Sequence, residues 1–145
     1  MISEGYVKNG AKVYISSRSV KDCDATAAEL NALAPGSCVA LPADLQKFSE
    51  AERLAKELAA REPALHVLVN NAGATWGASV DDHPDTAWTK ILTLNVQRVF
   101  SLTQLCLPLL RAAAAQGGKD GRAFRDPARI INVSASMVLC ARRVG

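Results

Sequence analysis

The stretch that decides the fold is Leu65-His66-Val67-Leu68-Val69-Asn70-Asn71-Ala72-Gly73. Its first part is a short apolar run rich in valine and leucine, which is typical of a buried strand rather than of a helix. The polar and small residues that follow favour a turn at the end of that strand. A strand that is apolar on both sides needs helices on both faces, so this stretch predicts a parallel sheet.

The same alternation of short apolar runs and amphipathic stretches extends in both directions from this strand. It predicts an α/β fold, a partial doubly wound and mostly parallel sheet with flanking helices. Ser19 is placed to cap the helix expected over 19–33, and Asn9-Gly10 to end the helix expected over 2–8. Ser49-Glu50-Ala51-Glu52 is expected to form a capping box that opens the next helix. Further strands are expected over 11–17, 37–41 and 129–133, and helices over 2–8, 19–33, 49–62 and 85–111, with Pro108 kinking or ending the last.

Composition narrows the class of protein. The 145 residues are 49% apolar and 21% charged, which fits one globular domain with its own core. A formal charge of +3 is small for a protein that binds nucleic acid through phosphates, so no nucleic-acid partner is expected. There is no apolar run long enough to span a membrane and no secretory signal, which predicts a cytoplasmic protein.

Cysteine and histidine spacing gives no metal site. The sequence contains no C-x-x-C pair, and His66 and His83 have no partners at ligand spacing. Reduced, buried thiols are the expected state of the four cysteines, which are Cys23, Cys38, Cys106 and Cys140.

Polar residues follow the predicted strands at the edge where open α/β sheets bind ligands. Arg18 follows the first strand, where its fork of donors suits a phosphate, although a solvated loop residue is the plainer reading. Asp44, followed by Leu45, either accepts from an adenine amine or caps a turn. Asn70-Asn71-Ala72-Gly73 allows close approach to a ligand or forms an Asx turn.

Two further candidates lie in the second half of the chain. Asn95 falls on an apolar face of the helix predicted over 85–111, so its amide must be satisfied by nearby backbone or by an ordered water that belongs to a proton relay. From its spacing alone, a structural role is the favoured interpretation of Asn95. Ser134 and Ser136 follow the last predicted strand.

Taken together, these residues resemble the classical short-chain dehydrogenase/reductase family, a Rossmann-fold group of NAD(P)-dependent oxidoreductases. The resemblance rests on Asn70 to Gly73 directly after a strand, Leu94-Asn95-Val96 in the next helix, and Asp44 after the preceding strand. It covers about residues 1–136 and leaves 137–145 as an atypical tail. It implies that Asp44 contacts adenine, that Arg18 selects NADP(H) by its 2′-phosphate, and that Asn95 holds a relay water.

The sequence also departs from this family. The family's T-G-x-x-x-G-x-G turn, which cradles the pyrophosphate, does not occur, and neither does its Y-x-x-x-K acid–base pair. Ala135 stands where the family has its serine, with Ser134 and Ser136 on either side. Residues 1–145 are therefore expected to be an incomplete NAD(P)-binding domain without the first strand and the C-terminal strands.

The first strand of such a sheet lies at its centre, so its loss separates the strands at 11–17 and 65–69. These two strands are expected either to pair directly or to leave apolar edges exposed. The strand at 129–133 is expected to lie at an edge of the sheet, with backbone groups on its outer side unpaired.

Three functions remain open from the sequence. The first is an inactive part of an NADP(H)-dependent oxidoreductase, whose family transfers hydride between the nicotinamide and a carbonyl or alcohol substrate. The second is a non-catalytic interaction module that joins a full-length relative, or an oligomer, through the helix at 85–111. The third is an active dehydrogenase with an unusual proton donor.

Overall fold

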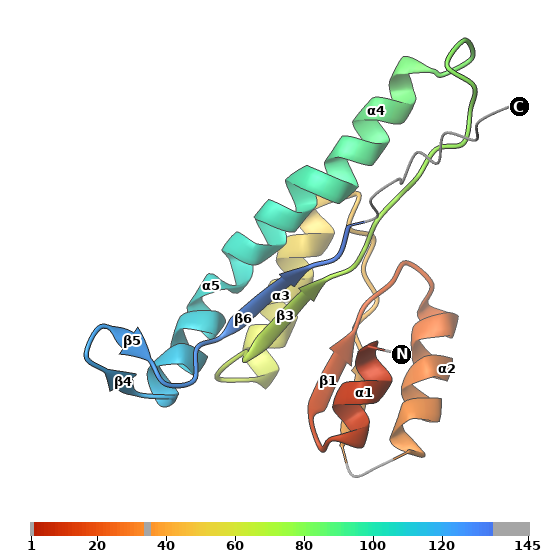
Figure 1. The fold of residues 1–145 in the computed structure, drawn as a ribbon. Helices are drawn as coiled ribbons and strands as arrows, with labels where there is room; N and C mark the ends of the chain where they lie inside the picture. The colour runs from red at the N-terminus through yellow and green to blue at the C-terminus, as the bar shows by residue number, and fades with distance from the viewer. Residues whose placement is uncertain (1, 34–35, 135–145) are drawn as a thin grey trace, which may run out of the picture.

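The computed structural model describes residues 2–33 and 36–134 and confirms the α/β class (Figure 1). Its helices are α1 (Ile2–Lys8), α2 (Val20–Asn31), α3 (Phe48–Arg61), α4 (Asp85–Leu92), the π-helical η1 (Thr93–Gln97) and α5 (Arg98–Gln116). Its strands are β1 (Lys12–Ile15), β2 (Ser37–Ala40), β3 (Val67–Asn70), β4 (Lys119–Asp120), β5 (Ala123–Phe124) and β6 (Arg129–Asn132).

The strands form three separate pairs. β1 and β2 are parallel with Ile15 opposite Ala40, and β3 and β6 are parallel with Asn70 opposite Asn132. Within the described residues no strand links β1 to β3, so the alternative with unpaired strand edges is the one observed. β6 pairs only with β3 in the described part of the chain, and it is an edge strand as expected.

A glycine-rich segment follows α5 and contributes β4 to a short antiparallel hairpin with β5. Gly118 and Gly121 have φ values of 70° and 60°, a backbone region that glycine enters without a steric cost. Gly118 lies between α5 and β4, and Gly121 lies in the turn that brings β4 and β5 together.

Helix starts agree with the sequence in one case and not in another. Ser19 caps α2 as predicted, since its Oγ accepts from the backbone N–H of Asp22 at 3.2 Å. The capping box at Ser49 is wrong, because α3 already begins at Phe48 and Lys47 occupies the cap position without a side-chain bond. A turn after Asp44 explains the shift: the N–H of Lys47 donates to the Asp44 carbonyl at 2.9 Å, which directs the chain into the helix earlier.

The long helix predicted over 85–111 is interrupted by η1 and extends beyond Pro108. Pro108 lies inside α5 and does not end it. Leu109, Leu110 and Ala113 are buried after the proline, so packing of this helix outweighs the backbone bond that proline removes.

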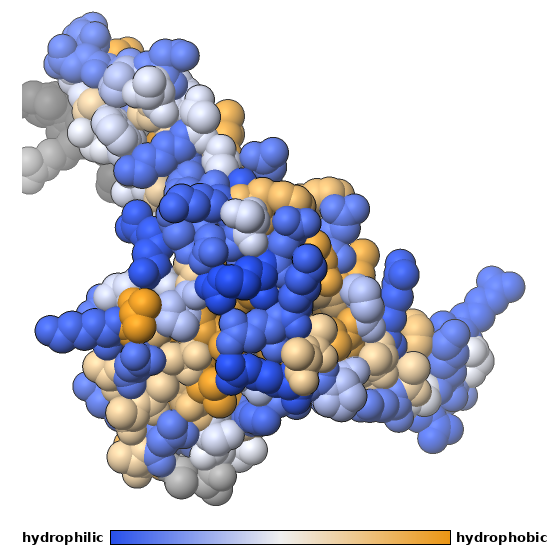
Figure 2. Space-filling view, turned by 180° about the vertical axis from the view of Figure 1, so that it is seen from behind, coloured by the Kyte–Doolittle hydropathy of each residue, from blue (hydrophilic) through white to orange (hydrophobic). Residues whose placement is uncertain are grey.

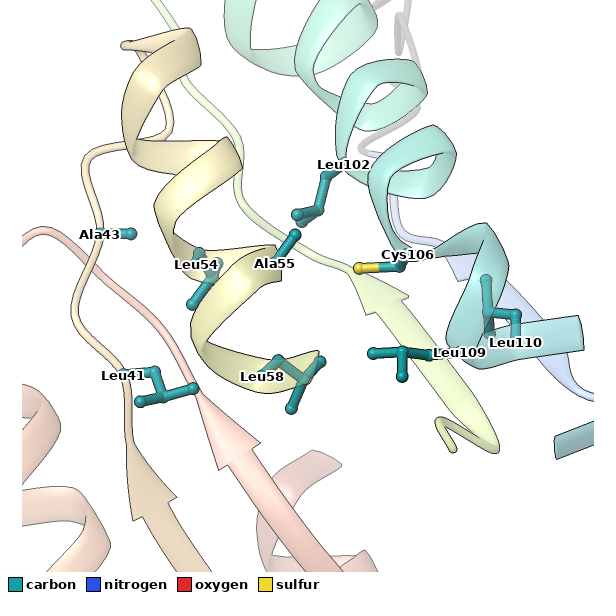
Figure 3. Packing of buried hydrophobic residues seen from close by; sticks show 9 residues of the cluster. All are labelled: Leu41, Ala43, Leu54, Ala55, Leu58, Leu102, Cys106, Leu109 and Leu110. Carbon is teal, nitrogen blue, oxygen red and sulfur yellow. The ribbon is translucent and has the colours of Figure 1, made fainter. Parts of the chain in front are cut away.

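The main core lies between α3 and α5, and part of the β2–α3 connection closes it (Figure 3). Leu102, Cys106 and Leu109 of α5 point toward Leu54 and Leu58 of α3 in this view. A smaller cluster joins α1, α2 and β2 through Val7, Ala27, Leu30 and Cys38. Each fully buried leucine contributes about 1.5–3 kcal/mol relative to an exposed one, so these two clusters hold the helices onto the strands.

Seen from behind, the molecule has hydrophilic side chains over its middle, and hydrophobic side chains appear as smaller separate patches (Figure 2).

Cys23, Cys38 and Cys106 are free and buried as predicted, whereas Cys140 lies outside the described residues. Burial raises the pKa of the Cys106 thiol to about 11, which keeps it protonated and inert.

A polar cluster connects β1 to the end of α3. The Tyr14 hydroxyl donates to Glu62 Oε1 at 2.6 Å, and Lys12 forms an ion pair with the same carboxylate. Tyr14 also packs against the main core. The cluster therefore joins β1 to the end of α3, from which the chain leads into β3.

Candidate functional site

Except for Asn70, which ends β3, and Asn95 in η1, the predicted site residues that the structure describes follow the carboxyl ends of the two parallel pairs, which point to the same side of the molecule (Figure 1). Backbone bonds extend both pairs beyond the carboxyl ends of their strands. The Ala43 N–H donates to the Ser17 carbonyl at 3.0 Å, and the Val133 N–H donates to the Asn70 carbonyl at 2.9 Å. Arg18, Asp44, Asn71 and Ser134 are each the next residue after one of these bonds.

Arg18 and Asp44 thus leave adjacent segments at the end of the first pair. The Arg18 side chain is exposed, and within the described residues it forms no ion pair. Asp44 is half-buried, and its Oδ1 accepts from the Gln46 N–H at 3.2 Å. The turn-capping interpretation of Asp44 is therefore confirmed, and it uses one of the two carboxylate oxygens.

The loop that contains Asp44 and Leu45 is held by a residue that the sequence analysis did not select. Arg98 is only 6% exposed, and it donates from Nε to the Leu45 carbonyl at 2.7 Å and from Nη2 to the Gln46 carbonyl at 3.2 Å. Its guanidinium carbon lies 5.6 Å from the centroid of the Phe48 ring. The available signal was an arginine about one helical turn after Asn95, followed by the apolar residues Val99 and Phe100.

The end of the second pair is fixed by Asn70. This side chain is 6% exposed, and its Nδ2 donates to Thr103 Oγ1 at 3.1 Å and to Asn132 Oδ1 at 2.9 Å. It therefore links β3 to both α5 and β6. The next three residues, Asn71, Ala72 and Gly73, are exposed beyond the strand.

Asn95 lies in the π-helical turn η1 and binds the loop after Gly73. Its Oδ1 accepts from the Ala74 N–H at 2.8 Å, and its Nδ2 donates to the Ala74 carbonyl at 2.9 Å. Satisfaction by backbone, one of the two alternatives, is thus confirmed. Asn95 is exposed, as are the apolar residues Leu92 and Val96 on the same stretch of helix.

The remaining candidates differ in what the structure describes. Ser134 is exposed just beyond β6, whereas Ser136 lies outside the described residues. Tyr14 is not suited to acid–base work, since burial and its bond to Glu62 raise its pKa above the usual value. No cluster of metal-ligating side chains occurs in the described ranges, and no helix there is long and apolar enough to cross a membrane.

Comparison with known proteins decides the family. The model of the family described as short chain dehydrogenase matches residues 1–139. The chain belongs to this family. Its parallel strands and flanking helices are therefore part of the Rossmann fold that the sequence predicted.

Individual relatives agree with this assignment. The chain is 42% identical over 135 residues to a rhamnolipids biosynthesis 3-oxoacyl-[acyl-carrier-protein] reductase of Pseudomonas aeruginosa, which covers 93% of the chain and 49% of the reductase. The solved Pseudomonas aeruginosa RhlG/NADP active-site complex matches with a TM-score of 0.80 at 42% identity and covers 90% of the chain and 47% of the complex.

A second solved structure, a metagenomic short-chain oxidoreductase in complex with NADP, matches with a TM-score of 0.76 at 25% identity. It covers 93% of the chain and 56% of that protein. The chain therefore spans about half the length of the relatives that it matches.

Proposed function

We propose that this chain carries the adenosine-binding part of an NADP(H)-dependent oxidoreductase that acts on a small carbonyl or alcohol compound in the cytoplasm. The observation that carries the proposal is the Ala43–Ser17 backbone bond at 3.0 Å, because it brings Arg18 and Asp44 to neighbouring positions at the end of β1 and β2. Residues 1–145 are then one incomplete NAD(P)-binding domain.

The residues at this edge fit the adenosine half of NADP(H). Arg18 presents an exposed guanidinium that suits a 2′-phosphate, and the structure gives it no described carboxylate to neutralise it. β1 ends at Ile15 and is followed by two serines, so no acidic residue is placed there to bind a ribose diol. Asp44 keeps one carboxylate oxygen for an adenine amine, beside Leu45.

The reaction end of the same site is assigned to the second pair. In this assignment Asn71, Ala72 and Gly73 lie beside the cofactor, Asn95 fixes the following loop, and Ser134 offers a hydroxyl to the substrate. Ser136, the other serine of the assignment, lies outside the described residues. When bound, NADP(H) supplies the hydride. The 145 residues contain neither the glycine-rich phosphate turn nor the tyrosine–lysine pair, so we propose that the chain binds the adenosine portion without turnover.

Titration of the chain with NADP⁺ and NAD⁺ tests the proposal. We expect the wild-type chain to bind NADP⁺ more tightly, and Arg18→Ala to weaken NADP⁺ binding about tenfold while NAD⁺ binding stays the same, because only NADP⁺ carries the extra phosphate. Arg122→Ala, at another exposed loop arginine, is the matched control. Equal affinity of the wild type for both nucleotides contradicts the assignment, and NADPH consumption with a ketone contradicts the lack of turnover.

A second function is favoured by one surface. Four large apolar side chains are exposed at four-residue spacing along α4, η1 and α5: Trp88 at 54%, Leu92 at 51%, Val96 at 60% and Phe100 at 69%. Side chains four apart lie on one helical face, so they form a stripe. We propose that this apolar stripe joins a second copy of the chain or a full-length relative.

Light scattering over a dilution series tests the stripe. Leu92→Glu is expected to shift the chain to monomers, because it places a charge in the centre of the apolar contact. Val80→Glu, which changes a valine that is 95% exposed in a loop, is the control. A wild-type chain that stays monomeric at all concentrations, and captures no full-length relative, contradicts this second function.

A further inference from the structure

Arg98 is a charged residue that the fold buries without an acidic partner. Its side chain is 6% exposed, and no carboxylate among the described residues forms an ion pair with it. Two backbone carbonyls and the face of Phe48 are its neighbours. Burying a charge is costly unless its hydrogen bonds are made, so a leucine or methionine would serve simple packing better.

The two carbonyls that Arg98 binds belong to the loop of the proposed adenosine site. Leu45 and Gln46 directly follow Asp44, and Gln46 makes a second contact with the helical side through its Nε2, which donates to the Lys90 carbonyl at 3.2 Å. The planar fork of an arginine can hold two neighbouring carbonyls at once. Leu45 and Gln46 therefore both attach the loop to α5, and Gln46 also attaches it to α4.

The backbone N–H of Arg98 contributes to the reaction end of the proposed site. Its N–H donates to the Thr93 carbonyl, a bond that spans five residues and closes the π turn around Asn95. Asn95 in turn binds both the N–H and the carbonyl of Ala74, just after Gly73. One residue thus connects the Asp44 loop to the turn that holds the Asn71–Gly73 segment.

We propose that Arg98 is a positioning residue that fixes the adenosine end of the nucleotide site relative to its reaction end. This inference rests on the proposed function for its effect on nucleotides, whereas its effect on the loop can be measured without any ligand. Arg98 touches neither substrate nor cofactor, and it acts through Leu45, Gln46 and the π turn.

Three variants separate this role from simple packing. Arg98→Met keeps the apolar stem and removes both donors, and Arg98→Lys keeps the charge without the planar fork. Arg53→Met is the matched control, because Arg53 donates to the Pro42 carbonyl at 2.5 Å in the same connection, from an exposed position beside Glu50 and Glu57.

Amide hydrogen exchange of the full chain is the first measurement. In Arg98→Met we expect the Gln46 and Lys47 amides to exchange about tenfold faster, since the loop loses two charge-assisted bonds, while amides inside α3 keep their rates. Arg98→Lys is expected to lie between Arg98→Met and wild type, and Arg53→Met to match wild type. Unchanged loop exchange in both Arg98 variants overturns the inference, as does equal acceleration in Arg53→Met.

The second measurement uses adenosine 2′,5′-bisphosphate as the probe, together with the NMR signals of the Asn95 side-chain amide. Arg98→Met is expected to weaken binding of the probe about tenfold and to shift the Asn95 signals, which a local loss of packing around Phe48 does not explain. Failure of the wild type to bind the probe contradicts the proposed function only, because the exchange rates still decide the role of Arg98. If Arg98→Met does not fold, the comparison of Arg98→Lys with Arg53→Met decides it.

Discussion

The two parallel pairs of strands have the same topology but very different burial. In the β1–β2 pair, Val13 and Ile15 pack on the small cluster and Tyr14 packs on the main core, so helices cover both faces. In the β3–β6 pair, Leu68 faces the main core, whereas Ile130 and Ile131 are 44% and 40% exposed. Pairing of strands satisfies backbone bonds in both cases, but only helices on both faces remove the apolar side chains from water.

The largest expected effect is on the free energy of unfolding, and it compares a buried residue next to the β1–β2 pair with an exposed residue of the β3–β6 pair. Leu41, which follows β2 and is 2% exposed, lies in the main core, so Leu41→Ala is expected to lower the free energy of unfolding by about 2–5 kcal/mol through lost burial and a cavity. Ile131→Ala in β6 leaves no closed cavity and is expected to cost about 1 kcal/mol. Urea denaturation measures both, and equal losses would contradict the difference in burial.

A smaller effect on the free energy of unfolding is expected at Asn70, whose hydrogen bonds link β3 to α5 and β6. Asn70→Ala removes bonds to Thr103 and Asn132 and leaves their polar atoms without this partner, which is expected to cost about 1–3 kcal/mol. Asn71→Ala, one residue further along and exposed, is the control and is expected to change stability by less than about 0.5 kcal/mol. Urea denaturation again gives the comparison, and a loss in Asn71→Ala as large as that in Asn70→Ala would show that the bonds of Asn70 contribute nothing specific.

The smallest effect tests the link between β1 and the end of α3 through its pH dependence. Hydrogen bonds from Lys12 and then from Tyr14 lower the pKa of Glu62 below its usual value of 4.5. The folded chain thus favours the carboxylate, and this contribution to stability is complete above pH 4.5 and is lost as the pH falls through the lowered pKa.

Thermal unfolding between pH 6 and pH 2 measures that loss, and Glu62→Gln is expected to have a shallower decline than wild type. Glu4, whose pKa is lowered to about 2 mainly by its hydrogen bond with Lys8, adds to the decline in both proteins, so only their difference reports on Glu62. Glu29→Gln at an exposed site of α2 is the control. Identical slopes for wild type and Glu62→Gln would mean that the polar cluster does not help to join β1 to the end of α3.

Much of the fold and part of the site follow from local sequence. Each of the four predicted strands exists, because an apolar run bounded by turn residues has few alternatives in a chain of this size. The same logic places Arg18, Asp44 and Asn71 at one edge, since residues after parallel strands share that edge. Trp88 and Leu92, in the helix predicted over 85–111, are exposed, because the α3–α5 core begins only at Leu102.

Other features depend on contacts between distant segments. The role of Arg98 requires the 44–46 loop to lie against α5, more than 50 residues away, as its bonds to Leu45 and Gln46 show. The bonds between Asn95 and Ala74 likewise join segments that are 21 residues apart. Neither leaves a periodic signal in the chain.

The amino-acid sequence determined the class of fold, the order of its parallel strands and the edge at which its polar residues gather, because these properties follow from local periodicity and from the chemistry of turns. The tertiary structure decided whether β1 and β3 pair, which faces are covered, and which atoms of Asp44, Asn95 and Arg98 are already bonded. Those outcomes depend on burial and hydrogen bonding between segments far apart in the chain, and no local pattern encodes them.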